Sequence, residues 1–189
     1  MTPPRLIGLV GYAGTGKDTV RHLLETEHGF VGLAFADPIR AMLRALFTTN
    51  GIDEKYIDER DHKEATIEDL LTAQPVTYRQ MAQTLGTEWG RNLSPDFWLQ
   101  IAGAFIAEQR RRGERLFVIS DVRFINEAQW IKDAGGELWH VHRPGVAAVR
   151  PHASEAEIAH IEVDRVIDNS GSLDDLWSRV DDVMGGVVV

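Results

Sequence analysis

The sequence predicts an α/β domain in which helices flank a doubly wound, mainly parallel, five-stranded sheet. Three observations support this fold class. Strand and helix patterns alternate along the 189 residues. The run Leu116-Phe-Val-Ile-Ser120 is almost wholly apolar, as in a parallel strand that is covered on both faces. The first expected strand leads through a glycine-rich turn into a helix, and the chain length suits one domain with its own core.

The five expected strands are short apolar runs that end in turn signals. The first run stops at Gly11, and the second stops before Asp37-Pro38, where proline suits the first turn of a helix. The expected strands span residues 5–10, 31–35, 116–120, 137–142 and 163–167.

The expected helices repeat apolar residues at helical spacing. They span residues 19–28, a segment from Pro38, then 77–91, 94–112, 126–134 and 172–184, and a further helix begins at Ser154. Ser94-Pro95-Asp96 is an expected N-cap with proline at the first helical position, and Gly113 and Gly135-Gly136 end two helices. The side chains expected to face inward are Val20, Leu23 and Leu24, then Ile39, Met42, Leu43 and Leu46, and finally Leu173, Leu176, Val180 and Val183.

The polar, acidic segment 49–75 is expected to form a peripheral helical excursion or a flap. Too few apolar residues recur there to predict deep burial. The Pro- and Gly-containing stretch 143–152 is expected to form a lid that closes over phosphates.

Charge and composition exclude several classes of protein. Twenty Lys and Arg against 29 Asp and Glu give a net charge of −9, which disfavours binding to a nucleic-acid polymer. Sixteen of the 20 basic residues are arginines, which suit small phosphates and carboxylates. No apolar run approaches a transmembrane length, and neither a signal peptide nor membrane association is expected. The absence of cysteine excludes disulfides and thiolate chemistry and fits a reducing cytoplasm.

The segment Gly11-Tyr-Ala-Gly-Thr-Gly16-Lys17-Asp18-Thr19 has Walker A spacing between an expected strand and an expected helix. Its backbone N–H groups and the helix N-terminus would cradle phosphates, and Lys17 would reach the β and γ phosphates. Asp18 stands where such loops usually carry the Ser or Thr that holds Mg²⁺, and a carboxylate can serve the ion directly or through water. An ordinary glycine turn is the alternative.

Asp121 ends the buried strand, which is the position of a magnesium-ordering carboxylate in phosphoryl-transfer enzymes. An N-cap of the next helix is the alternative for Asp121. Arg123 follows at the expected carboxyl edge of the sheet, where open α/β sheets bind ligands, and a surface arginine is its alternative. The other arginine candidates for an anion site are Arg40, Arg79, Arg91, Arg143 and Arg150.

Several other polar and aromatic patterns carry weaker functional hypotheses. His152, Ser154 and Glu155 are interpreted as solvated residues more readily than as a triad, and no His-Glu-x-x-His spacing predicts a zinc site. The five tryptophans are interpreted as core or packing residues, although Trp98 or Trp130 could stack a base: Trp89, Trp98, Trp130, Trp139 and Trp177.

Together these motifs resemble those of the bacteriophage deoxynucleoside monophosphate kinases, a branch of the P-loop NMP kinases. The resemblance runs in order through most of the chain, except for 49–75. It includes Gly14-Thr-Gly-Lys-Asp-Thr19, Leu33-Ala-Phe-Ala-Asp-Pro-Ile-Arg40, Arg79-Gln-Met-Ala-Gln-Thr-Leu-Gly-Thr87, Phe97-Trp98, Ile119-Ser-Asp-Val-Arg123, Glu127-Ala128, His140-Val-His-Arg-Pro-Gly145, His152-Ala-Ser-Glu155 and Val166-Ile-Asp-Asn-Ser-Gly-Ser-Leu173.

The resemblance implies ATP- and Mg²⁺-dependent phosphorylation of a deoxynucleoside monophosphate (dNMP) to the diphosphate. It implies ATP contacts at Ala13, Gly14, Thr15, Gly16, Lys17, Asp18 and Thr19, with Asn169 and Gly171 near the adenine. Mg²⁺ would be held by Asp18 and Asp121, and the catalytic set would be Lys17, Asp121, Arg123 and Arg143. Residues implied on the monophosphate side are Asp37, Arg40, Arg79, Gln83, Trp98, Arg123, Glu127, Trp130, Arg150, His152 and Glu155.

The resemblance also implies that the chain is a single domain with three parts: a core of about 1–48 and 114–189, a helical substrate-binding part of about 49–113, and a lid of about 143–155. The implied partners are small molecules, with a homodimer left open, and the implied location is the cytoplasm, that of the host if the chain is phage-encoded. Two alternatives remain: another P-loop small-molecule kinase, similar to dephospho-coenzyme A or phosphomevalonate kinases, and a nucleotide-binding switch or DNA-associated ATPase.

Overall fold

The computed structural model describes residues 5–68, 74–146 and 157–185. The chain forms two compact units, one made of Met1–Ala34 with Ala102–Val189 and the other of Phe35–Ile101. The helix that begins near Pro38 clusters with the second unit, whereas the sequence placed it in the core. The boundary therefore falls after the second strand and not after residue 48.

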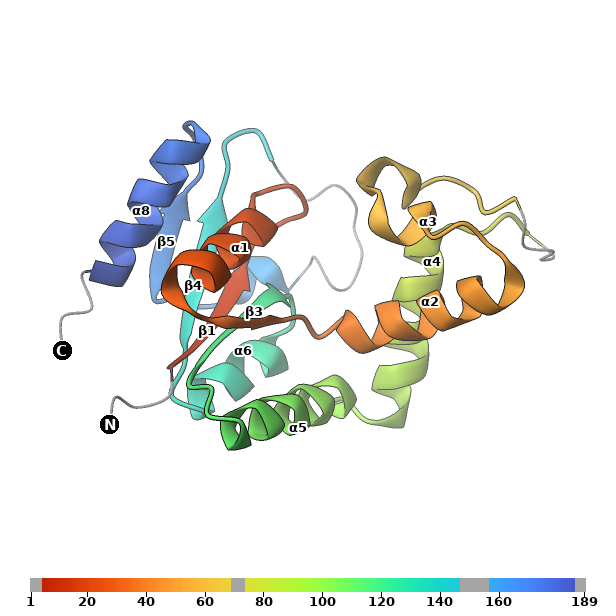
Figure 1. Ribbon diagram of the computed structural model, residues 1–189, viewed down its shortest axis with the longest axis horizontal. Coiled ribbons are helices and arrows are strands. Elements are labelled where there is room, and N and C mark those ends of the chain that lie inside the picture. The colour runs from red at the N-terminus through yellow and green to blue at the C-terminus, as the bar shows by residue number, and fades with distance from the viewer. Residues whose placement is uncertain (1–4, 69–73, 147–156, 186–189) are drawn as a thin grey trace. The chain divides into compact units, whose positions relative to one another are not determined.

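The first unit is built on a five-stranded sheet, which confirms the predicted fold class (Figure 1). Its strands are β1 (Arg5–Val10), β2 (Val31–Leu33), β3 (Leu116–Val122), β4 (Glu137–His142) and β5 (Arg165–Asp168). They lie in the order β2-β3-β1-β4-β5, and every neighbouring pair is parallel. Because β1 is parallel to both of its neighbours, β3 and β4, the carboxyl ends of these three strands lie at the same edge of the sheet.

Helices pack on both faces of this sheet. They are α1 (Lys17–His28), α6 (Ile125–Asp133) and α8 (Leu173–Gly185). The short η3 (Ile158–His160) and the second part of α5 (Phe97–Arg111) belong to the same unit. Ile7 and Leu9 of β1 belong to the core cluster that α1 and α8 cover. Gly8, between them, faces the opposite side, where a Cβ would lie 2.6 Å from Ile131 Cδ1 of α6. The strand is therefore covered on both faces.

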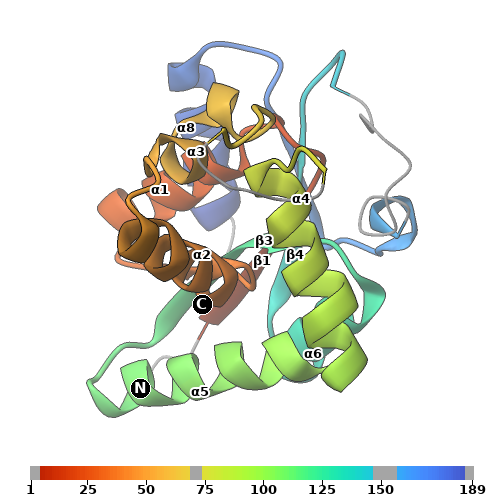
Figure 2. The same ribbon diagram turned by 90° about the vertical axis from the view of Figure 1, so that its right-hand side faces the viewer.

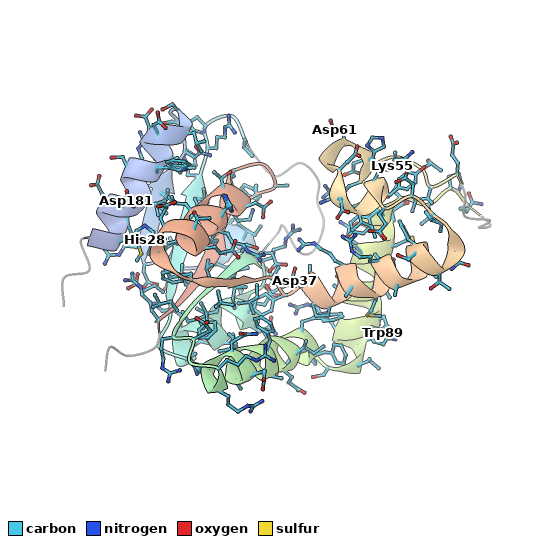
Figure 3. All side chains as sticks on the ribbon, viewed as in Figure 1. His28, Asp37, Lys55, Asp61, Trp89 and Asp181 are labelled. Carbon is cyan, nitrogen blue, oxygen red and sulfur yellow. The ribbon has the colours of Figure 1, made fainter. Side chains whose placement is uncertain are left out.

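The last helix packs as predicted at three of its four expected inward positions. Leu176 and Val180 are buried, and Val183 packs against the same cluster, but Leu173 is 51% exposed. Leu173 is the first residue of α8, so it lies beyond the end of the sheet-covering face. His28 at the end of α1 and Asp181 of α8 lie side by side in Figure 3, with His28 Nε2 2.9 Å from Asp181 Oδ1.

The second unit is helical. It comprises α2 (Asp37–Asn50), α3 (Lys55–Asp58), η1 (Arg60–His62), α4 (Tyr78–Gln83) and the π-helix η2 (Thr84–Arg91), and α5 begins in it; Figure 2 shows α2, α3 and α4 gathered together. The expectation that 49–75 buries little was wrong at four positions, since Ile52, Tyr56, Ile57 and Ile67 are each at most 6% exposed. Four well-spaced apolar side chains are enough to fix this segment to a core.

The inward face of α2 was also predicted partly wrongly. Ile39 and Leu43 are buried, but Met42 and Leu46 are 40% and 42% exposed, and Phe47 is fully buried instead. The buried positions therefore follow the spacing i, i+4, i+8. Among the described residues no helix is both long and apolar enough to cross a membrane.

Several boundaries differ from the predicted ones. Strand β3 continues two residues beyond Ser120, and β2 stops two residues before Phe35. Helix α5 begins at Phe97, because Ser94 uses its hydroxyl to accept from the Asp96 N–H and its carbonyl to accept from the Phe97 N–H, forming a turn before the helix. The helix predicted over 77–91 changes to π-type hydrogen bonding at Thr84. The helix start expected at Ser154 lies outside the described residues.

Candidate functional site

The glycine loop between β1 and α1 holds the ammonium group of Lys17. Lys17 is 9% exposed, and its Nζ donates to Gly11 O at 2.6 Å and to Tyr12 O at 2.8 Å. Thr15 Oγ1 donates to the same Tyr12 carbonyl at 3.0 Å. The backbone carbonyl groups of the loop therefore hold the Lys17 ammonium group in place.

Two glycines of the loop are required by its backbone. Gly11 has φ 148°, and a Cβ there would lie 2.7 Å from Val141 O. Gly16 has φ 102° and is the N-cap of α1. Glycine adopts such angles without strain, and Gly16 has no side chain with which to cap the first N–H groups of α1. The helix N-terminus can therefore receive an anion.

The two carboxylates predicted to hold Mg²⁺ belong to elements that meet at this edge of the first unit. Asp18 is exposed in the first turn of α1, and Asp121 is the partly buried penultimate residue of β3. The pairing of Val10 with Val122 brings the end of β3 beside the start of the glycine loop. The N-cap alternative for Asp121 was wrong, because Phe124 is the N-cap of α6.

The two carboxylates suit a magnesium ion that is held partly by a nucleotide. No group of three or more His, Cys, Asp or Glu residues that could hold a metal occurs within the described ranges. Mg²⁺ commonly binds through one or two carboxylates together with substrate phosphates and waters, so it needs no larger protein cluster. The chemistry of the donor set therefore fits this ion.

Glu127 fixes the turn that carries Arg123. It is 4% exposed, and its Oε2 accepts from Arg123 N at 2.9 Å and from Phe124 N at 3.1 Å. Glu157, which the sequence analysis did not single out, accepts from Ile125 N at 2.8 Å. A buried carboxylate that accepts two backbone N–H groups explains why the Glu127 position is acidic.

The carboxyl ends of β4 and β5 bring further residues beside the loop. Burial, the neighbouring His142 and then Lys17 lower the pKa of His140, which favours the neutral form of this half-buried ring. The rings of His140 and His142 are 6.2 Å apart, and Arg143 directly follows β4. Asn169, directly after β5, is 9% exposed and contacts the loop, whereas Arg150, His152 and Glu155 lie outside the described residues.

In the second unit, Arg40 interacts with Asp37 and Tyr78. Its NH1 lies 2.7 Å from Asp37 Oδ1 (Asp37 is labelled in Figure 3), and its positive charge acts on the hydroxyl of Tyr78. Burial raises the pKa of Tyr78, which is 6% exposed, and the Arg40 cation opposes that rise. Sequence reasoning missed Tyr78, although its place at the start of α4, next to Arg79, was a usable signal.

Helix α4 carries two further residues assigned to the monophosphate, Arg79 and Gln83. Thr77 caps it in a capping box with Gln80, so Arg79 lies in its first turn and Gln83 at its end. Arg79 pairs with Glu64. The residues predicted on the monophosphate side are divided between the units. Those of the second unit are Asp37, Arg40, Arg79, Gln83 and Trp98, and those of the first are Arg123, Glu127 and Trp130.

The tryptophans divide between packing and exposure. Trp98 is 5% exposed, and its Nε1 donates to Gly86 O at 2.8 Å, which favours packing over base stacking. Trp139 is fully buried, and Trp130 is partly buried beside Gly103. Trp89 (labelled in Figure 3) is 43% exposed but packs edge-to-face against Phe97, with ring centroids 5.5 Å apart, which agrees with a packing role. Trp177 is 42% exposed, so it is not a core residue.

Comparisons with known proteins agree on one family. The family model of the deoxynucleotide monophosphate kinases matches residues 44–180. A protein of Acanthamoeba polyphaga mimivirus with the same family name is 32% identical over 185 residues, or 93% of each chain. The deoxynucleotide monophosphate kinase of Escherichia phage RB69 is 28% identical over 107 residues, which are 56% of this chain and 44% of the phage protein.

One solved structure supports the fold alone. A sugar kinase from Janibacter sp. covers 97% of this chain and 95% of its own at a TM-score of 0.51, with 15% sequence identity.

Proposed function

Because this chain belongs to the deoxynucleotide monophosphate kinase family, we propose that it transfers the γ-phosphoryl group of ATP to the 5′-phosphate of a dNMP. The products are ADP and the deoxynucleoside diphosphate. The observation that carries this proposal is the buried Lys17 ammonium, held at 2.6 Å and 2.8 Å by the carbonyls of the glycine loop. A cation fixed in this way suits the β and γ phosphates of a nucleotide.

The acceptor in this reaction is an ionised phosphate oxygen, so a strong general base is not required. Catalysis then consists of aligning two anions and stabilising the charge that develops between them. Residues Ala13 to Thr19 bind the ATP phosphates with their N–H groups and with Lys17. Arg123, held by the Glu127 turn, and Arg143 lie on the transferring group.

Asp18 and Asp121 hold Mg²⁺ in this proposal. When bound, the ion neutralises charge on the β and γ phosphates. Asp121 is the stronger candidate for direct contact, because it is fixed within β3 and only partly exposed. Asp18 is exposed, which suits contact through water.

The acceptor monophosphate binds in the second unit, at Arg40, Arg79 and Gln83. Two arginines and an amide suit a dianionic phosphate. Asp37 orients Arg40, and Glu64 pairs with Arg79 until the substrate phosphate competes for it. Trp130, Arg150, His152 and Glu155 remain predicted contacts on this side.

A coupled assay of ADP release tests the proposal. It supplies ATP and Mg²⁺ with the four dNMPs, the ribonucleoside monophosphates, dephospho-coenzyme A or phosphomevalonate as acceptors. We expect turnover with at least one dNMP. Turnover with one of the last two acceptors and none with any dNMP would contradict the proposal, and so would ATP hydrolysis that only DNA stimulates.

Location and assembly belong to the same proposal. The absence of cysteine suits a reducing cytoplasm, and a homodimer is compatible with the sequence. Size-exclusion chromatography with light scattering measures the molar mass in solution and so tests whether the protein is a homodimer.

A further inference from the structure

The side chain of Asn169 joins the end of β5 to the glycine loop. Its Nδ2 donates to Thr15 O at 2.8 Å, across 154 residues of sequence, and the bond is buried. Its backbone N–H donates to His142 O at 2.6 Å, which ties the same residue to the end of β4. Asn169 is 9% exposed, so the amide is held inside the protein and not displayed to solvent.

The loop is shaped around this amide. A Cβ at Gly16 would overlap Asn169 Nδ2 and lie 3.4 Å from its Cγ. The space that the amide occupies is therefore the space that any side chain at position 16 would need. Gly16 is both the N-cap of α1 and the residue before Lys17, so the contact lies at the part of the loop that faces phosphates.

The Thr15–Gly16 peptide is thereby fixed in orientation. When the Thr15 carbonyl accepts a buried hydrogen bond from Asn169, the N–H of Gly16 on the same planar peptide must point the opposite way. On the preceding Gly14–Thr15 peptide, Thr15 N donates weakly to Tyr12 O at 3.4 Å, so the loop's own backbone bond next to the Thr15–Gly16 peptide is long. The Asn169 bond is the shorter and more buried constraint.

We infer that Asn169 is a positioning residue for phosphate binding: its amide holds the Thr15–Gly16 peptide so that the loop N–H groups face the triphosphate. This inference rests on the proposed function and refines it. Resemblance alone implied that Asn169 approaches adenine, whereas positioning of the loop affects any ligand that carries the phosphates. The two roles therefore differ in their dependence on the base.

Titration calorimetry with Mg²⁺ separates the roles. The ligands are ATP, GTP and inorganic tripolyphosphate, which has no base. Asn169→Ala removes the bond, and Asn169→Asp keeps the size of the side chain but cannot donate to Thr15 O. We expect both variants to bind all three ligands about tenfold more weakly, as for loss of one buried hydrogen bond.

Asn50→Ala is the matched control. Asn50 Nδ2 also donates to a backbone carbonyl, Leu46 O at 2.8 Å, but on an exposed helix surface. We expect unchanged affinity in this variant. Thermal unfolding followed by circular dichroism identifies a temperature at which every variant is folded. If Asn169→Ala does not fold, the binding measurements on Asn169→Asp alone test the inference.

Unchanged tripolyphosphate affinity in the folded Asn169 variants would overturn the inference, and so would a loss for ATP that GTP does not share. Because these measurements record binding, they stand apart from the acceptor assay. Failure of the dNMP assay with a normal Asn169 effect would reject the proposed acceptor and keep the positioning role.

Discussion

Lys17 contributes the central charge of the proposed phosphate site. Lys17→Ala removes a cation that acts on the transferred group, so we expect kcat/KM to fall by about 10²- to 10³-fold. Lys17→Met tests whether filling the same space without charge restores activity, and we expect that it does not. The coupled assay measures both variants, with circular dichroism as the folding control. Activity within a few-fold of wild type would rule out the assigned role of Lys17.

Tyr78 and Tyr56 form a matched pair for testing the acceptor side. Both are 6% exposed in the second unit, but the hydroxyl of Tyr78 interacts electrostatically with Arg40, whereas Tyr56 packs against His62. We expect Tyr78→Phe to raise the KM for dNMP about threefold to tenfold, because the loss of one polar partner leaves Arg40 less well oriented, with the KM for ATP unchanged. Tyr56→Phe should change neither constant. An equal effect of the two substitutions on both constants would indicate general destabilisation instead.

The π-helix η2 depends on close packing against α5. A Cβ at Gly90 would lie 2.6 Å from Trp98 Cε2, whereas a Cβ at Gly103 of α5 would lie 3.4 Å from Trp130 Cζ2, an ordinary contact. We expect Gly90→Ala to lower the free energy of unfolding by about 1–3 kcal/mol through overpacking. Gly103→Ala should be neutral or stabilising by up to about 1 kcal/mol, because alanine is the better helix former. Urea unfolding measures both, and equal stabilities would contradict the packing role of Trp98.

Strand β5 is fastened at its start by Asp164. Its carboxylate accepts from Leu138 N at 2.7 Å and from Lys132 Nζ at 2.5 Å. Burial alone would raise the pKa of Asp164, but these two donors outweigh burial and lower it. A lowered folded-state pKa gives stability that is present above the unfolded value near 4 and is lost as the pH falls through the folded value.

Asp164→Asn should therefore destabilise the protein at pH 7, by about 1 kcal/mol after allowance for solvent screening. The difference from wild type should shrink between about pH 5 and pH 3. Asp133→Asn removes the same charge from a carboxylate bonded only to the Gln129 amide among the hydrogen bonds described, and it controls for net charge. Urea unfolding at four pH values measures the effect, and a pH-independent difference would contradict it.

Elements with one strong pattern could be predicted from the sequence, and elements set by tertiary contacts could not. Strand β4 and helix α1 follow their apolar periodicity, and the glycine loop follows its spacing. The π-helix contacts Trp98 of α5 through Gly86 and Gly90, and Ile57 is buried, and no local apolar pattern reports either feature. The functional site divides in the same way. The motif spacing predicts the role of Lys17, but the interaction of Tyr78 with Arg40 and the contact of Asn169 with Thr15 form only when the chain folds, so the sequence does not predict them.

At the scale of the whole molecule, the net charge of −9 and the phosphate site have separate causes. Acidic residues of the second unit are largely engaged with nearby cations: Arg44 pairs with Glu54 and Asp58, and Arg79 pairs with Glu64. The glycine loop in the first unit offers N–H groups and a lysine to an anion. Net charge therefore excludes a polyanion more strongly than it excludes a nucleotide that a preorganised loop binds.

The two units are expected to respond to different ligands. The loop residues 11–19 and Asn169 lie in the first unit, whereas Arg40, Arg79 and Gln83 lie in the second. A bound ligand stabilises the backbone that it contacts, and at a ligand concentration of 100 times the dissociation constant the gain in free energy of unfolding reaches about 2.7 kcal/mol.

We therefore expect an unreactive ATP analogue to slow amide hydrogen exchange at least about tenfold in residues 11–19, and a dNMP alone to slow it in residues 77–84. The analogue with Lys17→Ala serves as the control and should protect 11–19 less. Protection of 11–19 by dNMP alone, with 77–84 unaffected, would place the acceptor in the first unit and contradict the assignment of Arg40 and Arg79.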